Sequence, residues 1–252
     1  MHSPTKSSSK YNLVCFHKCG STIIERILSN SASFISQDRT LVKPRIFTPI
    51  SLTLSDKDVA VDIDMVKRLD WLPPYSGNDK FIFVVRNPLS IAISMFYSFA
   101  YTHSPLDSGF SEKDHLEKQL LIRKIGLNKF AGRRMNGLCK NLNKVFDDNE
   151  FQNKLILPYE LMISNFSQFL HLFLNHINLP SLHQSIYEKH NKSFRPIRDR
   201  TDEIIKKGLK IHKRTTDINE WKKKFSTEEI EIFENDFPMV KKYQDFLLSH
   251  NL

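Results

Sequence analysis

The segment from residue 11 to residue 28 combines a strand-like run, a short polar loop and an amphipathic helix, and it constrains the fold more than any other part of the chain. The run YNLVCFH at 11–17 is apolar and carries aromatic and β-branched residues, which is typical of a strand buried on both faces. The run STIIERILSN at 21–30 places its aliphatic residues on one face of a helix. A strand that passes into a helix through so short a loop predicts an α/β fold.

The connecting loop has the residue types of an anion-binding site. Lys18 brings a positive charge and Gly20 lets a ligand approach the backbone closely. Ser21 and Thr22 add hydroxyl groups at a helix N-terminus, where free N–H groups and the helix dipole attract anions. The loop is not a Walker A motif, because Lys18 precedes its one glycine. We therefore predict a phosphate or sulfate site, with an ordinary strand–helix turn as the alternative.

A second strand–helix unit occupies residues 80–101, KFIFVVRNPLSIAISMFYSFAY. Its apolar strand ends before Arg86, Asn87 is a favourable N-cap, and Pro88 is a favourable first helical residue. Arg86 and Ser94 supply a guanidinium and a hydroxyl that can hold one phosphate, and the alternative is a capped helix with a buried serine. Because ligands bind beyond the carboxyl ends of parallel strands, we expect Arg86 at the same sheet edge as the first loop.

Strands alternate with helices along the chain, since short apolar runs recur at 32–36 and at 154–159. This alternation predicts a three-layer α/β/α fold with a central parallel sheet. We expect a disordered polar tail at 1–10 and a single domain at 11–252. The segment 40–57, broken by two prolines, is expected to be irregular.

The charge balance favours an anionic partner. The 252 residues include 37 Lys and Arg against 28 Asp and Glu, a formal net charge of +9. Such an excess attracts nucleotides and sulfated or phosphorylated molecules. Net charge alone is weak ground for nucleic-acid binding, so no nucleic-acid partner is expected. The three cysteines match no zinc spacing, so no metal is expected. The sparse cysteines and the lack of a secretory signal or a long apolar run favour a soluble cytoplasmic protein.

Two motifs taken together, HKCGST at 17–22 and RNPLSIAIS at 86–94, resemble the sulfotransferase family. LPYELM at 157–162 and RTTDINEWKKKF at 214–225 resemble two further family segments, the second without its glycines. The resemblance runs from about residue 11 to 225. It implies a P-loop-NTPase-like sulfotransferase fold. It also implies an enzyme that transfers a sulfuryl group from 3′-phosphoadenosine 5′-phosphosulfate (PAPS) to a hydroxyl or amine and releases adenosine 3′,5′-bisphosphate (PAP).

The resemblance assigns a role to each matching residue. Lys18 would contact the sulfuryl group and the bridging oxygen as a catalytic residue, and the rest of the loop would cradle the 5′-phosphate. The loop residues concerned are Cys19, Gly20, Ser21 and Thr22. Arg86 and Ser94 would hold the 3′-phosphate. Arg214 would join them, and Tyr159 would lie by the adenine.

The base that takes the proton from the acceptor is left open. Members of the family use a histidine between the two cofactor motifs or a glutamate downstream of the lysine loop. This chain has no histidine between His17 and His103, and His17 stands where the family usually has proline. We take Asp38, at the presumed end of the second strand, as the candidate base, with His17 and His103 as alternatives. The other acids in this stretch are Asp56, Asp58, Asp62, Asp64, Asp70 and Asp79.

Other functions remain open at this level. A P-loop-like kinase predicts dependence on Mg²⁺ and ATP, and a silent relative predicts binding of a nucleotide or polyanion without turnover. For an enzyme, a small molecule, a lipid or a saccharide is a compatible acceptor. The run VAVDID at 59–64 resembles a Walker B strand, but without Walker A we interpret it as a half-buried strand or a helix start. We interpret the basic stretches at 123–134 and 203–214 as solvated helix faces, with binding of an anionic acceptor as the alternative.

Overall fold

The computed structural model describes residues 9–32, 34–36, 50–56, 59–72, 75, 79–102, 111–147, 149, 151–194, 200–207 and 215–252. The chain divides into two compact units, residues 1–85 with 144–194 and residues 86–143 with 195–252. Each unit has its own architecture, and the expectation of one domain at 11–252 stays a prediction. The first strand begins at Ser9, inside the segment that the sequence assigned to the tail.

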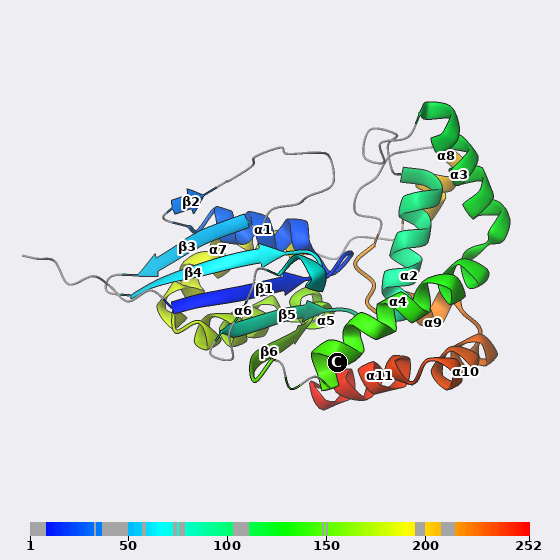
Figure 1. Ribbon diagram of the computed structural model, residues 1–252. Coiled ribbons are helices and arrows are strands. Elements are labelled where there is room, and N and C mark those ends of the chain that lie inside the picture. The colour runs from blue at the N-terminus through cyan, green and yellow to red at the C-terminus, as the bar shows by residue number, and fades with distance from the viewer. Residues whose placement is uncertain are drawn as a thin grey trace, which may run out of the picture. The chain divides into compact units, whose positions relative to one another are not determined.

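The first unit is built on a six-stranded sheet with the strand order β2-β3-β4-β1-β5-β6 (Figure 1). The strands are β1 (Ser9–Cys15), β2 (Phe34–Ser36), β3 (Ile50–Asp56), β4 (Val59–Val66), β5 (Lys80–Val85) and β6 (Asn153–Pro158). β1 runs parallel to both β4 and β5, and β5 runs parallel to β6. The predicted α/β class is confirmed, with a central sheet that is mostly parallel.

Strand β3 corrects two details of the sequence prediction. It lies within the segment 40–57 that was expected to be irregular, and it begins directly after Pro49. Leu52 and Leu54 are buried while the residues between and beside them are half-buried, so the strand has one face in the core. β3 pairs antiparallel with β2 and with β4, which makes the sheet mixed rather than wholly parallel. Pairing with β4 along seven residues stabilises β3, a long-range effect that local sequence does not carry.

Strand β4 decides between the two interpretations of VAVDID, because the segment is a strand throughout. The intervening aspartates lie on the other face from the buried residues, where neighbouring strands engage them. Thr53 Oγ1 donates to Asp62 at 2.6 Å, and the Lys10 ammonium lies 2.9 Å from Asp64. The hydrogen bond to Asp64 holds the pKa of Lys10 above its ordinary value. These aspartates therefore serve cross-strand pairing in the sheet.

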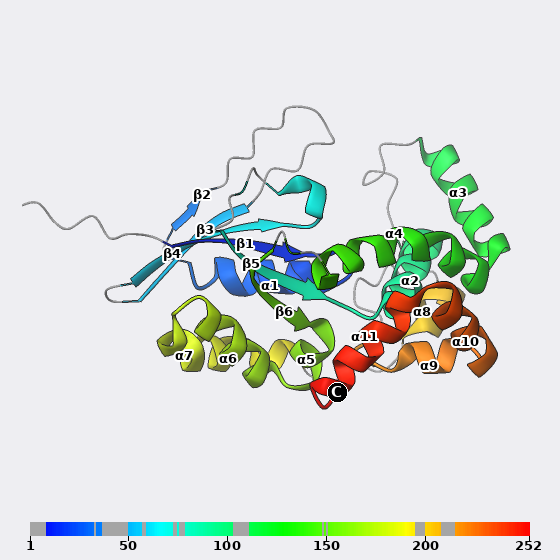
Figure 2. The ribbon, with the colours of Figure 1, turned by 60° about the horizontal axis from the view of Figure 1, so that its bottom comes forward.

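Helices cover one face of this sheet, as Figure 2 shows for α1, α6 and α7. The helices of the unit are α1 (Ser21–Ser29), α5 (Tyr159–Ser164), α6 (Phe166–His176) and α7 (His183–His190), with short turns η1 (Leu69–Trp71), η4 (Pro180–Leu182) and η5 (Asn191–Phe194). The Tyr11 hydroxyl of β1 donates to the backbone oxygen of His176 at 3.0 Å and so ties α6 to the sheet. On the opposite face, Phe81 and Phe83 stack with centroids 5.9 Å apart, and Phe151 packs edge-on against both.

The second unit is helical. Its elements are α2 (Pro88–Tyr97), the π-helix η2 (Ser98–Thr102), α3 (Glu112–Ile125), α4 (Leu127–Asp147), α8 (Thr201–Lys207), α9 (Glu220–Lys224), α10 (Thr227–Asp236) and α11 (Pro238–Ser249), and α4 enters the first unit at Lys144. Phe96 of α2 packs edge-on against Phe130 of α4 with centroids 5.7 Å apart. Arg123 Nε donates to the Ala100 carbonyl at 2.8 Å, which joins α3 to η2. In the part of the chain that the structure describes, no helix is both long and apolar enough to cross a membrane.

Candidate nucleotide-binding site

The loop after β1 is a tight turn with two residues in the left-handed conformation. Lys18 has φ 66° and Gly20 has φ 82°, and the Cys19 N–H donates to the Phe16 carbonyl at 3.0 Å. The turn sends the Cys19 side chain into the core, where it is fully buried, while His17 is exposed and Lys18 half-exposed. A lysine tolerates this backbone at a cost of about 1 kcal/mol or more, so the surrounding structure holds the turn in place.

Helix α1 begins at this turn with its N-terminus open. Gly20 is the N-cap residue, and its carbonyl accepts from the N–H groups of Ile23 and Ile24 at 2.9 and 3.1 Å. The N-cap residue makes no side-chain cap hydrogen bond and the first turn holds no acidic residue, while Ser21 is half-exposed and Thr22 exposed. An uncapped helix N-terminus beside a lysine is suited to bind an anion.

Tyr159 lies against this loop, although 139 positions separate it from Gly20 in the sequence. A β-carbon at Gly20 would stand 3.0 Å from Cε2 of Tyr159 and 2.6 Å from Cε of Met162. Tyr159 is the first residue of α5 and follows β6 directly, and both it and Met162 are buried. The structure therefore brings two of the predicted site segments together in the first unit, with Gly20 as the residue that makes room for the ring.

Arg86 follows immediately after β5, which ends level with β1. Cys15 pairs with Val84, and the Phe16 N–H donates to the Val84 carbonyl at 3.4 Å. Arg86 is 8 % exposed and interacts with other residues of the protein. Asn87 caps α2 as expected, since its Oδ1 accepts from Leu89 N–H at 2.9 Å.

Ser94 is half-buried on α2, and a second serine lies on the same helix face one turn earlier. Ser90 is 2 % exposed, and its hydroxyl has no partner among the residues that the structure describes. Sequence reasoning missed Ser90, although its spacing of four from Ser94 was a usable signal. A buried hydroxyl without a partner costs free energy in the ligand-free protein, so Ser90 is a further candidate for ligand contact.

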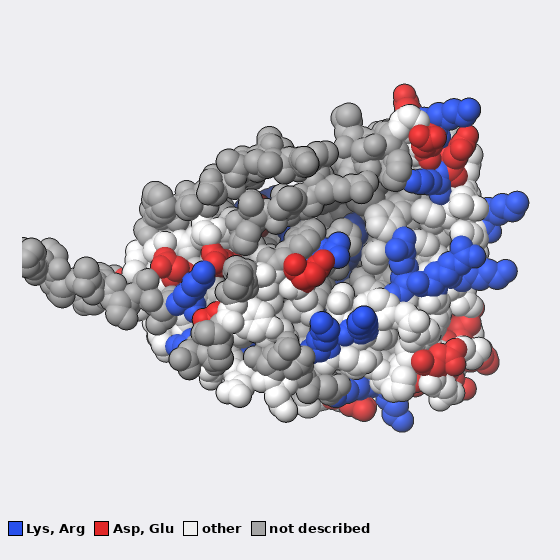
Figure 3. Space-filling view, viewed as in Figure 1, with Lys and Arg blue, Asp and Glu red and all other residues white. Residues whose placement is uncertain are grey.

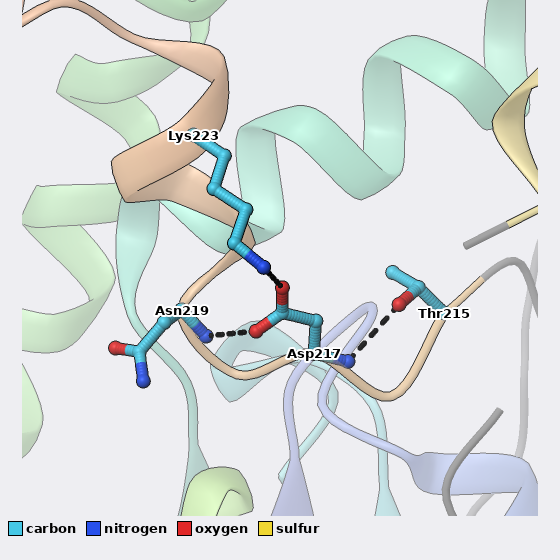
Figure 4. Close-up of polar contacts among 4 residues, drawn as sticks. All are labelled: Thr215, Asp217, Asn219 and Lys223. Atoms are coloured by element: carbon cyan, nitrogen blue, oxygen red, sulfur yellow. Dashed lines mark hydrogen bonds and ion pairs between the residues drawn. The ribbon is translucent and has the colours of Figure 1, made fainter. Parts of the chain in front are cut away.

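The segment before α9 belongs to the last of the four segments on which the family resemblance rests. It folds around Asp217 (Figure 4). The Asp217 carboxylate accepts from Asn219 N–H at 2.9 Å and pairs with the Lys223 ammonium at 2.6 Å. The backbone N–H of Asp217 donates to Thr215 Oγ1 at 3.0 Å. Trp221 is buried at the start of α9. Arg214, the expected third contact to the 3′-phosphate, lies outside the described residues.

The candidate bases are placed only in part. Asp38 and His103 lie outside the described residues, and His17 is exposed beside Lys18. Several aspartates of the same stretch already have partners: Asp56 accepts from Ser181, Asp62 from Thr53, Asp64 from Ser51, and Asp70 from Arg68. Among the described residues, His, Cys, Asp and Glu side chains form no group of three that suits a metal ion. The identity of the base therefore stays open among the three predicted residues.

All three cysteines are free and buried. Cys15 Sγ donates to the Cys19 carbonyl at 3.4 Å, and Cys19 Sγ donates to the His17 carbonyl at 3.8 Å, so both thiols brace the turn. Burial raises the pKa of Cys15 above its ordinary value and that of Cys139 to about 11. Thiolate chemistry at Cys15 is disfavoured for this reason, and Cys19 contributes to the loop by its backbone.

Comparison with known proteins adds a fold relationship. No family model and no curated protein matches the sequence. Among solved structures, mouse sulfotransferase SULT7A1 in complex with PAP superimposes with a TM-score of 0.51 at 14 % identity, over 90 % of this chain and 82 % of that one. The chain has a sulfotransferase-like α/β fold.

Two further solved structures match more weakly. Elongation factor SelB from Methanococcus maripaludis, bound to GppNHp, has a TM-score of 0.25 at 8 % identity, over 70 % of this chain and 35 % of that one. The cytosolic domain of the T. maritima iron transporter FeoB, in a GDP form, has a TM-score of 0.23 at 8 % identity, over 79 % of this chain and 98 % of that one. Neither superposition is close enough to support an argument about this chain.

Proposed function

We propose that this protein is a PAPS-dependent sulfotransferase. The observation that carries the proposal is the loop of residues 18–22, in which two left-handed residues lead into an uncapped helix on a sulfotransferase-like fold. The fit to a nucleotide rests on two features of the structure. The Tyr159 ring lies against the loop at Gly20, where a β-carbon would stand 3.0 Å from Cε2, and the buried Ser90 hydroxyl has no partner among the described residues.

The two sequence motifs bind opposite ends of PAPS in this proposal. Gly20, Ser21 and Thr22 offer N–H and hydroxyl groups to the 5′-phosphate, and Cys19 contributes its backbone. Arg86 and Ser94 hold the 3′-phosphate, because a guanidinium binds phosphate bidentately. The remaining predicted contacts are Tyr159 with the adenine and Arg214 with the 3′-phosphate.

PAPS supplies an activated sulfuryl group when it is bound. The acceptor oxygen or nitrogen forms a bond to sulfur while the bond from sulfur to the phosphate oxygen breaks. The acceptor proton passes to a base, for which Asp38, His17 and His103 are the candidates. Lys18 donates to the departing oxygen, where negative charge grows in the transition state, and so lowers the barrier without a metal ion. The acceptor is a hydroxyl or amine of a small molecule, lipid or saccharide, and the proposed location is the cytoplasm.

The test is a thermal melt with and without PAP, with ATP and Mg²⁺ alongside. At about a hundredfold excess over Kd, PAP stabilises the folded state by about 2.7 kcal/mol, a rise of about 5 to 10 °C for a chain of this size. Arg86→Ala should abolish the rise. Arg68→Ala, which removes an exposed arginine paired with Asp70, is the control and should keep it.

Each result of the melting experiment favours one of the three candidate functions. A rise with PAP that Arg86→Ala removes supports the nucleotide assignment, and transfer of labelled sulfuryl from PAPS to an acceptor library then tests turnover. PAP binding without turnover on any acceptor favours the silent relative. No rise with PAP, or a rise with ATP alone, overturns the proposal, and the second result favours the kinase.

A further inference from the structure

Helix α4 carries its positive charges on its exposed side. It carries five Lys and Arg residues, and its one acidic residue, Asp147, is the last of the helix. From Leu127 to Phe146, every exposed residue of α4 is Lys, Arg, Asn or Gly. The buried side is apolar and includes Met135, Leu142 and Val145. The helix thus presents a cationic face to solvent over most of its length.

Four of the cations form a single row. They are Lys129, Arg133, Lys140 and Lys144, at spacings of four, seven and four. At 100° per residue they fall within about 60° of one another around the helix, and at 1.5 Å per residue they span about 22 Å along it. The fifth cation, Arg134, is turned aside and stacks over the rings of Phe99 and Phe130 at 5.7 and 5.4 Å.

No residue that the structure describes neutralises this row, since none of the four cations forms an ion pair or hydrogen bond there. Figure 3 shows blue side chains along the course of α4 without red ones among them, and red side chains over α10. Beside the row, Asn128 donates to the carboxylate of Glu229. The same carboxylate accepts from the Ser226 N–H in the capping box of α10. Like charges four residues apart destabilise a helix, so the row has a cost in the free protein that an anionic partner would remove.

The residues between the cations indicate which polyanion fits. Asn136 and Gly137 lie at the centre of the row, and Asn141 and Asn143 flank its far end. Amides bond hydroxyl groups as well as anions, and glycine lets a bulky chain approach. The exposed face of α4 has no aromatic residue for base stacking, which single-stranded nucleic acids require, and no apolar residue for insertion into a membrane.

We propose that the cationic row on α4 is a docking surface for a linear anionic polysaccharide. Sulfate or carboxylate groups along the polymer pair with the three lysines and with Arg133, which can bind an anion bidentately, and sugar hydroxyls bond the asparagine amides. The surface is independent of the nucleotide assignment and holds whether or not the chain transfers sulfuryl groups.

The experiment measures binding of a fluorescent heparin oligosaccharide, long enough to span the row, as a function of salt. The test variant changes Lys129, Lys140 and Lys144 to Gln. The matched control changes Lys113, Lys192 and Lys241 to Gln, three exposed lysines elsewhere with the same loss of net charge. We expect the test variant to bind about tenfold more weakly or worse, with a salt slope smaller by about two to three, and the control to stay within about twofold of the wild type. Unchanged melting temperatures show that both variants fold.

Competition identifies the partner class. Displacement of the oligosaccharide by unlabelled heparin at lower concentration than by polyglutamate or by single-stranded or duplex DNA of equal total charge supports the proposal. Stronger competition by DNA or polyglutamate overturns it in favour of that class. Equal losses in the test and control variants overturn it as well, because binding would then follow net charge and not the row.

Discussion

The backbone of Gly20 lies against the ring of Tyr159, so closely that a β-carbon at Gly20 would stand 3.0 Å from Cε2 of the ring. Gly20 also has φ 82°, a conformation that other residues adopt at a cost. Two independent constraints, one steric and one conformational, therefore demand glycine at the start of α1. The same residue shapes the loop to which we assign the 5′-phosphate.

Replacing Gly20 by alanine should destabilise the protein by at least about 2 kcal/mol, because the substitution combines a left-handed backbone with a clash against Met162 and Tyr159. It should also abolish stabilisation by PAP. Gly132→Ala is the matched control: Gly132 lies inside α4 and a β-carbon there meets nothing within 4 Å. That change should stabilise the protein by about 0.5 to 1 kcal/mol. Urea unfolding measures both, and equal behaviour of the two variants would contradict the close packing at Gly20.

The Asn87 cap should be needed for α2 to begin where it does. Asn87 is fully buried and its Oδ1 accepts from Leu89 N–H at 2.9 Å and from Ser90 N–H at 3.4 Å. Asn87→Ala should cost about 1 to 2 kcal/mol, while Asn87→Ser, which keeps a capping oxygen, should cost less than half as much. Chemical denaturation compares the two. Because Arg86 precedes the cap directly, the alanine variant should also bind PAP more weakly, and identical stabilities would rule out a capping role.

Removal of the Ser90 hydroxyl should affect the stability of the free protein and the binding of ligand differently. The hydroxyl is buried without a partner among the described residues, so Ser90→Ala should leave the free protein equally stable or more stable by up to about 1 kcal/mol. If Ser90 contacts the nucleotide, the same variant should show a smaller rise in melting temperature with PAP. A loss of stability in the free protein would show that the hydroxyl has a structural partner.

The thiols should be inert in the native protein. Cys15 and Cys19 are fully buried and Cys139 is 6 % exposed, and burial raises the pKa of Cys139 to about 11. At pH 8 each native thiol should react with Ellman's reagent about a hundredfold more slowly than in guanidinium, where three equivalents should appear. Rapid reaction of any native thiol would contradict the burial of that cysteine.

Two histidines, the half-buried His176 and the buried His190, should make stability fall on acidification. Burial lowers the pKa of His176, aided by the charge of Lys80, and lowers that of His190, aided by Lys189 and Arg26. The unfolded chain therefore binds more protons once the pH falls below about 6.5, so the free energy of unfolding decreases from there down to the lowered folded pKa values.

The double variant His176→Gln, His190→Gln should show a flatter dependence of stability on pH between about 7.5 and 5.5, measured by urea unfolding at each pH. His171→Gln, which removes an exposed imidazole from the same helix as His176, controls for the loss of a histidine. An unchanged slope in the double variant would mean that neither His176 nor His190 governs the acid response.

The sequence by itself determined the local units of this protein. The apolar run before Lys18 and the helix after Gly20, and the strand, cap and helix around Arg86 and Asn87, follow from apolar patterning, capping and turn chemistry that act within a few residues. These signals sufficed to predict the α/β class and to name the site segments. Asp38, His103 and Arg214 lie outside the described residues, so their assignments rest on sequence alone.

Only the tertiary structure decided which distant residues meet. Strand β3 forms because β4 pairs with it, although its own sequence beside two prolines gave no such indication. Tyr159 reaches Gly20 because β6 adds to the sheet beside β5 and delivers α5 to the end of β1. The cations of α4 form one exposed row because packing buries the opposite side of the helix. In each case the deciding energy is pairing or burial between segments far apart in the chain, which local patterns do not encode.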